Sequence, residues 1–462
     1  MIKEANMSRK RGSHKDLNPS RSAGLLSSAD DPKDRIRDPI HGFIRFSPNE
    51  RQVIDHPLFR RLRHIRQLAL TEYVYPGATH SRFGHSLGVM EIVTRMFDVL
   101  CAKNGSLMED VFRKDSRFSD NPLATARQAV RVAALLHDTG HAPFSHAVEK
   151  FAHKDADHEH LSIQIASEHA LLGGTLKSLW GEQMPTLVAQ LLSGKDLPPQ
   201  LLVLRHLVSS QLDGDRMDYL LRDSYYCGVE YGRFDHRRLI ESLEVIGDEN
   251  IGLEIAINRD GIHTLEAFVL ARYQLFTQVL YHRVRRIYDG YLLDYFKALG
   301  EEAPKTPEAV LATDDIQMTA KIMRDADGRE DEAGKWARRI CYRKHHRMVF
   351  ETGMSASAND LRAFKHAREA LEKKYTDVYN DEAIGAIHKL ELPSDTEERQ
   401  GVPLRVVRPS GPPRLATEES NILRGMQRNF ACGRLFLDLD DKKARTDANK
   451  IAETAYIEAG GR

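Results

Sequence analysis

The stretch RVAALLHDTGHAPFSH, residues 131–146, holds the most informative pattern in this chain. Residues 132–136 form an apolar run of small residues and good helix formers. Gly140 follows closely, and glycine commonly stands just past the C-terminus of a helix. The imidazole of His137 and the carboxylate of Asp138 are therefore expected side by side where a buried helix ends.

Two more imidazoles, those of His141 and His146, follow within the same stretch. A buried carboxylate with no counter-charge is costly, so this cluster requires a cation. A divalent metal ion is the simplest candidate, because neutral imidazole and carboxylate are both good ligands.

A complete set of metal ligands can be assembled from distant segments. His85 lies near the start of one expected helix and Asp215 near the start of another, and they add to His137 and Asp138. Helical proteins build metal sites in this way, with inward-facing side chains from separate helices. Two imidazoles and two carboxylates suit Mn, Fe, Co, Ni or Zn and leave open positions for water.

Each of these four residues also has an ordinary structural explanation. His85 could cap a helix, and His137 and Asp138 could form a hydrogen-bonded pair. Asp215 could be an N-cap, a position where Asp is favoured. The coincidence of all four near the ends of apolar helices favours the metal site over these separate explanations.

The composition indicates a large protein without a strong overall charge. The chain has 462 residues, a formal net charge of +0, and four widely spaced cysteines that form no CxxC pair. This neutrality gives no general attraction to nucleic acid or membranes, and the cysteine spacing argues against a disulfide framework or a thiolate zinc site. No apolar run has the length of a membrane span and no signal-peptide core is present, so we expect a cytoplasmic protein.

The chain divides into three expected regions. Residues 1–34 form a polar, basic tail that is expected to be disordered, with a nucleic-acid-binding arm as the alternative. Residues 35–303 are expected to be mainly helical and to carry the chemistry. Residues 304–462 have shorter apolar runs and strand-like segments such as GRLFLDLD, so a smaller α+β region is expected there, for packing or subunit contact.

Local patterns give several expected elements. Ser47 to Glu50 is a capping-box pattern that predicts a helix start. Residues 57–70 predict a helix with one arginine-rich, solvated face. A helix is expected to begin at Pro143 and carry Glu149, and another to begin near residue 158 and stop at residues 173–174. A strand is expected over residues 251–257 and one long helix over residues 264–299.

Four blocks of sequence resemble the HD-domain metal-dependent phosphohydrolases. In chain order they are HSRFGHSLG, LLHDTGHAPFSH, HEH and DGDRMDYLLRD, joined by DPIHG and YVYPGATHSRFGH. Within that family the similarity is to the deoxynucleoside triphosphate triphosphohydrolases, the branch that includes the animal SAM-and-HD-domain enzyme. The resemblance runs from about residue 38 to about residue 289 and implies a mainly α fold with an HD-domain helical core.

The resemblance also implies roles for individual residues. The metal ligands of the family match the four residues proposed above. His141 and His158 match active-site histidines, and His158 matches the general acid. Glu149 matches the carboxylate that orients this histidine, an arrangement that acid–base chemistry also favours. Without the family, His158 could be a surface histidine in a polar segment.

The other residues carried over from the family bind the substrate. Guanidinium groups suit phosphate oxygens, although an arginine in a helix is also commonly an interhelical ion pair. Two of the residues stand one helical turn apart and match the contacts to the sugar and its 3′-hydroxyl. The set comprises Arg82, Arg216 and Arg272 for phosphates, Tyr219 and Asp223 for the sugar, and Gln67 and Leu68 for the wall of the sugar pocket.

Some positions depart from the family pattern. Arg216 stands where the animal enzyme has a lysine, and Leu280 and Phe276 replace polar residues near the base and phosphates. The base preference is therefore open. Asp55 and Arg63 match residues that read a guanine effector, but Arg60 replaces a glutamine there, so an effector site is a hypothesis only.

The implied reaction is attack of a metal-activated water on the α-phosphorus of a deoxynucleoside triphosphate (dNTP), with Mg accompanying the substrate. The products would be a deoxynucleoside and inorganic triphosphate, and the protein would be a homo-oligomer, a dimer or tetramer. Two alternatives stay open. One is another HD-type phosphohydrolase, such as a nucleotidase, phosphodiesterase or nuclease, and the other is a non-catalytic protein that binds nucleotides or nucleic acid.

Overall fold

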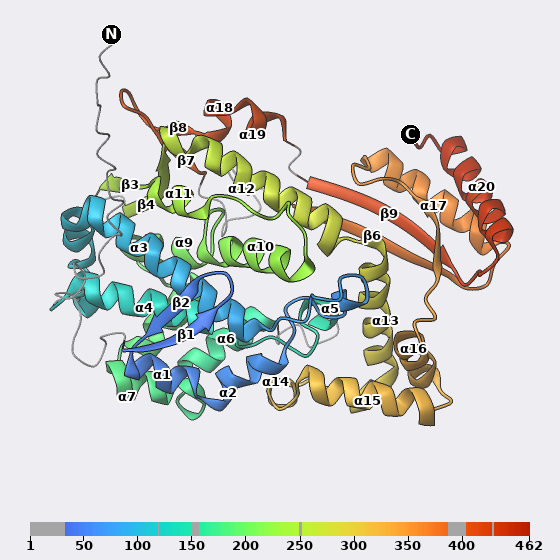
Figure 1. The fold of residues 1–462 in the computed structure, drawn as a ribbon, viewed down its shortest axis with the longest axis horizontal. Helices are drawn as coiled ribbons and strands as arrows, with labels where there is room; N and C mark the ends of the chain where they lie inside the picture. Colours follow the sequence, from blue (N-terminus) through green and yellow to red (C-terminus); the bar gives the residue numbers. More distant parts are fainter. Residues whose placement is uncertain (1–32, 119, 150–156, 249–251, 387–402, 427–428) are drawn as a thin grey trace, which may run out of the picture.

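Helices make up most of the structure, which confirms the expected mainly α class (Figure 1). The computed structural model describes residues 33–118, 120–149, 157–248, 252–386, 403–426 and 429–462. The tail expected over residues 1–34 lies outside these residues except for its last two. Within the described part, no helix is both long and apolar enough to cross a membrane.

The helical core is built around three helices. They are α3 (Arg82–Phe112), α4 (Pro122–Leu136) and α10 (Gly214–Cys227), and α3 packs against both of the others. Asn121 caps α4 with its side chain, and every residue of α4 from Ala126 onward is buried. This packing brings the start of α3, the end of α4 and the start of α10 together.

An N-terminal hairpin and a short helix complete this side of the core. β1 (Asp34–Asp38) pairs antiparallel with β2 (Gly42–Phe46), and α1 (Pro48–Ile54) follows. The capping box of Ser47 and Glu50 is present, as the sequence predicted. Glu50 also accepts a hydrogen bond of 2.6 Å from Nε of Arg131, so this buried ion pair ties α1 to α4.

The prediction of a single helix over residues 57–70 is wrong. Only α2 (Pro57–Arg60) and one 3₁₀ turn (Arg61–His64) form, and the chain is extended at Ile65. Arg61 is buried instead of lying on a solvated face. Its guanidinium donates to three main-chain carbonyl oxygens, those of His141, Val310 and Thr313. These acceptors come from distant segments, which a helical pattern cannot reveal.

Two other expected helices differ at their ends. The helix expected from Pro143 is α5 (His146–Glu149), because Phe144 and Ser145 have positive φ angles of 61° and 54°. The helix that starts at residue 158 is α6 (His158–Ser167), which ends before the extended residue Glu168. A π-helical turn (His169–Gly173) and α7 (Gly174–Trp180) follow, so the expected end at residues 173–174 is wrong.

The single helix expected over residues 264–299 is broken. α12 (Ile262–Leu275) leads into a π-helical turn (Phe276–Leu280), and α13 (Arg283–Leu299) starts anew. Nδ1 of His282 accepts from the backbone N–H of Val284 and so caps α13. No glycine or proline marks this break in the sequence.

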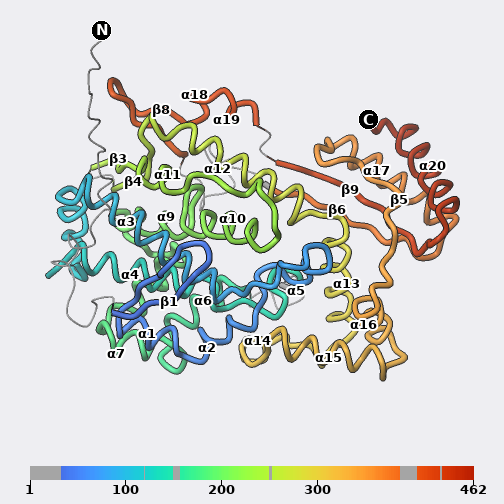
Figure 2. Tube along the Cα trace, viewed as in Figure 1, coloured from blue at the N-terminus to red at the C-terminus, as the bar shows by residue number. Residues whose placement is uncertain are grey.

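A group of strands and two helices lies at the far end of the molecule from α3 and α4 (Figure 2). We call it the C-terminal lobe. Its sheet has the order β5-β9-β6, with β5 (Arg347–Glu351) and β6 (Val378–Ala386) both antiparallel to β9 (Asn429–Leu437). The amphipathic helices α17 (Ala358–Glu372) and α20 (Lys442–Glu458) pack on it.

A second sheet joins the two halves of the chain. Its order is β3-β4-β7-β8, and β4 (Gly252–Asn258) pairs in parallel with β7 (Arg405–Val407). A strand from beyond residue 303 thus extends a sheet of the preceding region, and the boundary at residue 303 remains a prediction. The other named elements are β3 (Leu243–Asp248), β8 (Arg414–Leu415), α8 (Met184–Ser193), α9 (Leu202–Val208), α11 (His236–Glu241), α14 (Pro307–Leu311), α15 (Asp315–Gly328), α16 (Glu332–Cys341), α18 (Ala416–Glu419) and α19 (Asn421–Gly425).

Candidate metal centre and active site

The four expected metal ligands come together at the meeting point of α3, α4 and α10. Nε2 of His85 lies 3.1 Å from Oδ1 of Asp215 and 3.6 Å from Oδ2 of Asp138. Nε2 of His137 lies 3.3 Å from Oδ1 of Asp138 and 3.8 Å from Oδ1 of Asp215. One ligand atom each of His85, His137 and Asp215 fall within 4.8 Å of one another, close enough to bind one ion.

In both His85 and His137, a hydrogen bond at Nδ1 sets the orientation of the ring and turns Nε2 toward the centre. Nδ1 of His85 lies 2.8 Å from Oδ2 of Asp218, and Nδ1 of His137 lies 2.8 Å from the carbonyl oxygen of Ala134. Because both partners are acceptors, each Nδ1 carries a proton, and each Nε2 faces the centre, where a bound metal ion would take the place of any proton on it. Nε2 of His137 is buried and has no hydrogen-bond partner, which fits a ligand for a cation.

The electrostatics of the centre also favour a cation. Burial lowers the pKa of His85, but hydrogen bonds to Asp215 and Asp218 outweigh it and raise the pKa to about 10. Burial raises the pKa of Asp138, yet the positive charge of Arg82 and the neighbouring histidines hold it well below its usual range. The acidic side chains thus favour positive charge at the centre, and the nitrogen and oxygen donors gathered there fit a divalent metal ion.

Asp215 is available to the centre because another residue caps its helix. Oδ1 of Asp213 accepts from the backbone N–H of Arg216 at 2.7 Å, which makes Asp213 the N-cap of α10. The alternative explanation of Asp215 as the N-cap is therefore wrong.

A buried network behind His85 was missed by the sequence analysis. Asp218 accepts from Nε of Arg222 at 2.8 Å and contacts Nε2 of His41 at 2.6 Å, and Nη1 of Arg222 donates to Oδ2 of Asp38 at 2.8 Å. The spacing of Asp218 and Arg222, one helical turn apart, and the DPIHG motif were signals that could have found it. Gly88 leaves room for the network, because a Cβ there would lie 1.9 Å from Oδ1 of Asp218.

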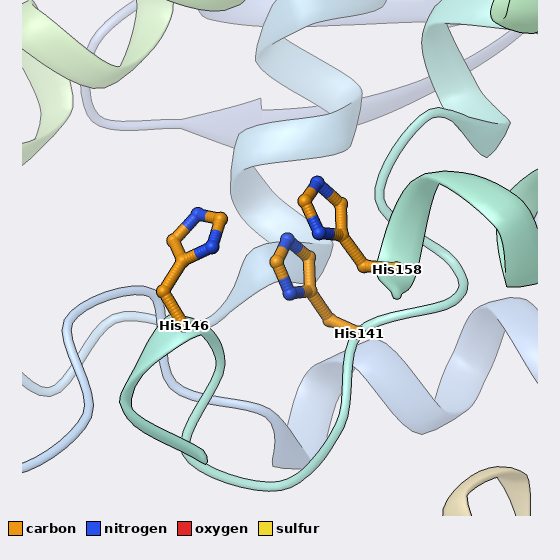
Figure 3. Close-up of side chains that lie close together, drawn as sticks. All are labelled: His141, His146 and His158. Atoms are coloured by element: carbon orange, nitrogen blue, oxygen red, sulfur yellow. The ribbon is translucent and has the colours of Figure 1, made fainter. Parts of the chain in front are cut away.

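A cluster of three histidines lies beside the metal centre (Figure 3). The rings of His141 and His158 stack with centroids 3.9 Å apart and planes at 8°, and His146 meets both rings edge-on. Nε2 of His141 lies 3.3 Å from Oδ1 of Asp138, so the cluster adjoins the centre. A Cβ on Gly140 would lie 2.4 Å from the carbonyl oxygen of His158, so glycine permits this approach of α6.

The stacking of the histidine cluster bears on its chemistry. The lone pair of an imidazole lies in the ring plane, so parallel rings point their lone pairs side by side and not at one common ion. This arrangement suits proton transfer and anion binding better than a second metal ion. Glu149, expected to orient His158, ends α5, but its side chain lies outside the described part of the structure, and its role stays a prediction.

Two neighbouring cavities lie at and beside the centre. The smaller, of about 310 Å³, is lined by His137, Asp138, His158, Asp215 and Arg216 among others. The larger, of about 650 Å³, runs outward toward α13 and β6. They share the lining residues Gln67, Arg82, His146 and Tyr219, so the two cavities lie next to each other.

The three arginines that were expected to bind phosphates differ in whether they line the cavities. Arg82 lines both cavities, donates from Nε to Oγ of Ser145 at 2.7 Å and contacts Asp138. Arg216 lines the smaller cavity and folds back onto Asp213. Arg272 is buried against the ring of Phe276 and is not among the residues that line either cavity, so direct contact with a ligand would require it to move.

The expected sugar-binding residues lie in the larger cavity. Leu68, Asp223 and Tyr219 line it, and so does Gln67, whose buried Oε1 has no hydrogen-bond partner. Phe276 and Leu280 form an apolar part of its wall.

The residues of the hypothetical effector site lie elsewhere. Asp55 and Arg63 are exposed and line neither cavity, and the guanidinium of Arg63 stacks 3.6 Å from the ring centroid of Phe83. The effector site therefore stays a prediction.

Comparison with known proteins gives two matches to protein families. Residues 82–201 match the HD domain, and residues 234–384 match the HD associated region. The first match covers the segment from Arg82 to the start of α9, and so contains three of the four expected ligands, all but Asp215.

Individual proteins are also similar. The chain is 38% identical over 252 residues to the uncharacterized protein YwfO of Bacillus subtilis, covering 54% of this chain and 52% of that protein. It is 30% identical over 273 residues to the deoxynucleoside triphosphate triphosphohydrolase SAMHD1 homolog of Dictyostelium discoideum, covering 56% of this chain and 48% of that protein. The chain thus spans about half the length of these relatives.

A solved structure supports the fold over most of the chain. A hypothetical protein from Aquifex aeolicus superimposes with a TM-score of 0.71 at 25% sequence identity, covering 90% of this chain and 99% of that one. The similarity therefore includes the C-terminal lobe as well as the helical core.

Proposed function

We propose that this chain, which belongs to the HD-domain family of phosphohydrolases, hydrolyses deoxynucleoside triphosphates to a deoxynucleoside and inorganic triphosphate. The observation that carries the proposal is the convergence of two imidazoles and two carboxylates where a cavity begins that extends well beyond the metal centre. The similarity to SAMHD1 homologs, which are named as deoxynucleoside triphosphate triphosphohydrolases, supports this choice of substrate.

The residues that would hold the metal ion are His85, His137, Asp138 and Asp215. Their nitrogen and oxygen donors fit Mn, Fe, Co, Ni or Zn, and Mg would accompany the nucleotide. A divalent ion bound there lowers the pKa of water and polarises phosphate oxygens.

The cationic side chains of the smaller cavity would bind the triphosphate. Arg82 and Arg216 both line this cavity, and a guanidinium group donates in a fork that matches phosphate oxygens. The ion pairs with Asp138 and Asp213 hold the two side chains in place before a ligand arrives. Such positioning reduces the reorganisation needed when charge develops on the leaving triphosphate.

The histidine cluster would supply the proton for the leaving group. His158 stands at the first turn of α6 and lines the smaller cavity, where it could protonate the departing 5′-oxygen. His141 is buried and stacked on it, which fixes the orientation of the His158 ring. A general acid in this position typically contributes 10²–10⁴-fold to the rate.

The larger cavity would hold the nucleoside. Tyr219 and Asp223 lie one turn apart on α10, and Gln67 and Leu68 line the same cavity. The apolar wall of Phe276 and Leu280 offers a stacking surface for a base but no hydrogen-bonding side chain. We therefore leave the base preference open.

One assay tests the proposal directly. Purified protein is incubated with each dNTP separately and with all four mixed, in the presence of Mn²⁺ or Mg²⁺, and nucleoside and triphosphate are separated by chromatography. We expect both products in equal amounts, and none from the variant Asp138→Ala, which loses a ligand. Activity on monophosphates alone would replace the proposal by a nucleotidase, and activity of Asp138→Ala equal to wild type would remove the metal mechanism.

The assembly and regulation of the protein are separate proposals. A homo-oligomer, dimer or tetramer, is expected from the family, and light scattering of the purified protein tests it. An effector site at Asp55 and Arg63 predicts sigmoidal kinetics and activation by GTP or dGTP. Hyperbolic kinetics that do not respond to either nucleotide would exclude that site.

A further inference from the structure

A histidine outside the metal centre and the histidine cluster binds the proposed sugar-binding carboxylate. Nε2 of His80 lies 2.8 Å from Oδ1 of Asp223, and the side chains of both residues are 3% exposed. The His80 ring also stacks on Tyr226 of the same helix as Asp223, with centroids 4.6 Å apart and planes at 14°. His80 is thus held in one orientation toward the carboxylate.

The hydrogen bonding of His80 fixes the direction of this contact. Its Nδ1 is buried and has no hydrogen-bond partner. A buried N–H without an acceptor is costly, whereas Asp223 is a strong acceptor, so the proton belongs on Nε2 and is donated to Oδ1. This occupies one oxygen of Asp223 and leaves Oδ2 for a hydroxyl group of a ligand.

The main chain around His80 is tied to other groups of the cavity. Its carbonyl oxygen accepts from the backbone N–H of Gln67 at 3.0 Å, and Arg82, two residues later, donates its backbone N–H to the carbonyl oxygen of Ile65 at 2.9 Å. Gln67, Arg82 and Asp223 all line the larger cavity. The segment that carries His80 therefore sets the spacing between three groups that face the proposed substrate.

We propose that His80 is a positioning residue, which holds the Asp223 carboxylate toward the 3′-hydroxyl of the substrate's sugar and makes hydrolysis depend on that hydroxyl. This rests on the proposed function, because it requires a nucleoside in the larger cavity. His80 does not touch the substrate itself. Its contribution is to orient one oxygen of Asp223 and to keep the carboxylate from turning away.

The test compares two substrates that differ only in the 3′-hydroxyl, a dNTP and the corresponding 2′,3′-dideoxynucleoside triphosphate. The variant His80→Phe keeps a ring on Tyr226 but removes the N–H donor, and His80→Gln restores a donor at a similar reach. His263→Phe is the matched control. It removes another histidine–carboxylate pair, that of His263 with Glu266 at 2.9 Å, on the exposed face of α12.

The readout is the ratio of kcat/KM for the dNTP to kcat/KM for its dideoxy analogue. We expect His80→Phe to lower this ratio about tenfold, as the loss of one hydrogen bond to an ionised group would. His80→Gln should recover most of the ratio, and His263→Phe should leave it unchanged. Asp223→Asn should lower the ratio as well, and His80→Phe combined with Asp223→Asn should lower it no further, because both act on one contact.

Two results would overturn the role of His80. One is an equal loss on both substrates in His80→Phe, which is the outcome of a purely structural role. The other is a ratio of kcat/KM near one for wild type, which would mean that no group of the protein distinguishes the dNTP from its dideoxy analogue by the 3′-hydroxyl. Wild-type protein that hydrolyses no dNTP at all would instead overturn the proposed function, and the role of His80 with it.

Discussion

Nδ1 of His85 lies 2.8 Å from Oδ2 of Asp218, and both side chains are buried. The carboxylate is held in turn by Arg222 and His41. A carboxylate behind a ligating histidine fixes its tautomer and raises its basicity, and loss of such a partner typically lowers metal affinity 10–100-fold. We therefore expect the network to support the proposed metal centre, although none of its members besides His85 is an expected ligand.

The first prediction concerns this network. Asp218→Asn should lower metal affinity by about 10–100-fold, and with it the metal retained after dialysis, while the four ligands stay intact. Metal content after dialysis, measured by mass spectrometry, checks it. Asp98→Asn is the control, since Asp98 forms a half-exposed ion pair with Arg127 away from the centre. Equal metal content in wild type and Asp218→Asn would contradict a role of the network in metal binding.

The second prediction concerns the close approach of α3 and α10. Gly88→Ala should destabilise the fold, because a Cβ would lie 1.9 Å from Oδ1 of Asp218 and 2.5 Å from Nη2 of Arg222. Such overpacking typically costs about 1–3 kcal/mol of unfolding free energy. Gly105→Ala on the same helix is the control, because its nearest neighbour would be Cδ1 of Leu123 at 3.9 Å. Urea unfolding of both variants checks it, and equal midpoints would be evidence against the crowding.

The third prediction concerns removal of the metal ion. Without it, the buried carboxylate of Asp138 and the carboxylate of Asp215, whose side chain is 34% exposed, lose a shared counter-charge, so chelation should lower the melting temperature. A ligand present at 100 times its Kd stabilises the folded state by about 2.7 kcal/mol, and that increment should be lost. Differential scanning fluorimetry with and without chelator measures the shift. The variant Asp215→Asn should show a much smaller shift in melting temperature. A shift identical to that of wild type would mean that the stabilising metal ion does not bind at this site.

The sequence predicted those features that have local signals. The pair His137 and Asp138 follows an apolar helix directly, and the capping box at Ser47 lies within four residues, so both could be found from short patterns. The convergence of His85 and Asp215 with this pair was a hypothesis from their places near expected helix starts, which the family resemblance then matched, because nothing local relates segments that are more than 40 residues apart.

Other features depend on contacts that no local pattern contains. Arg61 looks like one of several surface arginines, yet its acceptors are carbonyl oxygens near residues 141 and 310–313. The break after α12 has no glycine or proline, and it arises where Phe276 and Tyr281 pack against β6 and β9 of the C-terminal lobe. Tertiary packing overrides helix propensity at such places.

The last prediction concerns Asp315, which links the C-terminal region to the active-site loops. Its two carboxylate oxygens accept from the backbone N–H groups of Arg66 and Phe144 at 2.9 and 2.7 Å. Arg66 precedes Gln67, and Phe144 lies between two histidines of the cluster. Burial raises the pKa of Asp315 to about 6, from an ordinary value of 3.8, although these hydrogen bonds oppose the shift.

The raised pKa of Asp315 makes the folded state less stable as the pH rises. Between about pH 4 and pH 6 the folded protein holds the proton more tightly than the unfolded chain does. The stabilising contribution is therefore fully present below the unfolded pKa of 3.8 and is lost as pH rises through about 6, by on the order of 3 kcal/mol at most.

Asp315→Asn removes this titration but keeps an oxygen that can accept from one of the two amides. Its unfolding free energy, measured in urea from pH 4.5 to pH 7, should fall less steeply with pH than that of wild type. Asp260→Asn, at an exposed position, should leave the wild-type slope unchanged. Parallel curves for wild type and Asp315→Asn would show that Asp315 is ionised throughout this range, and would contradict the raised pKa.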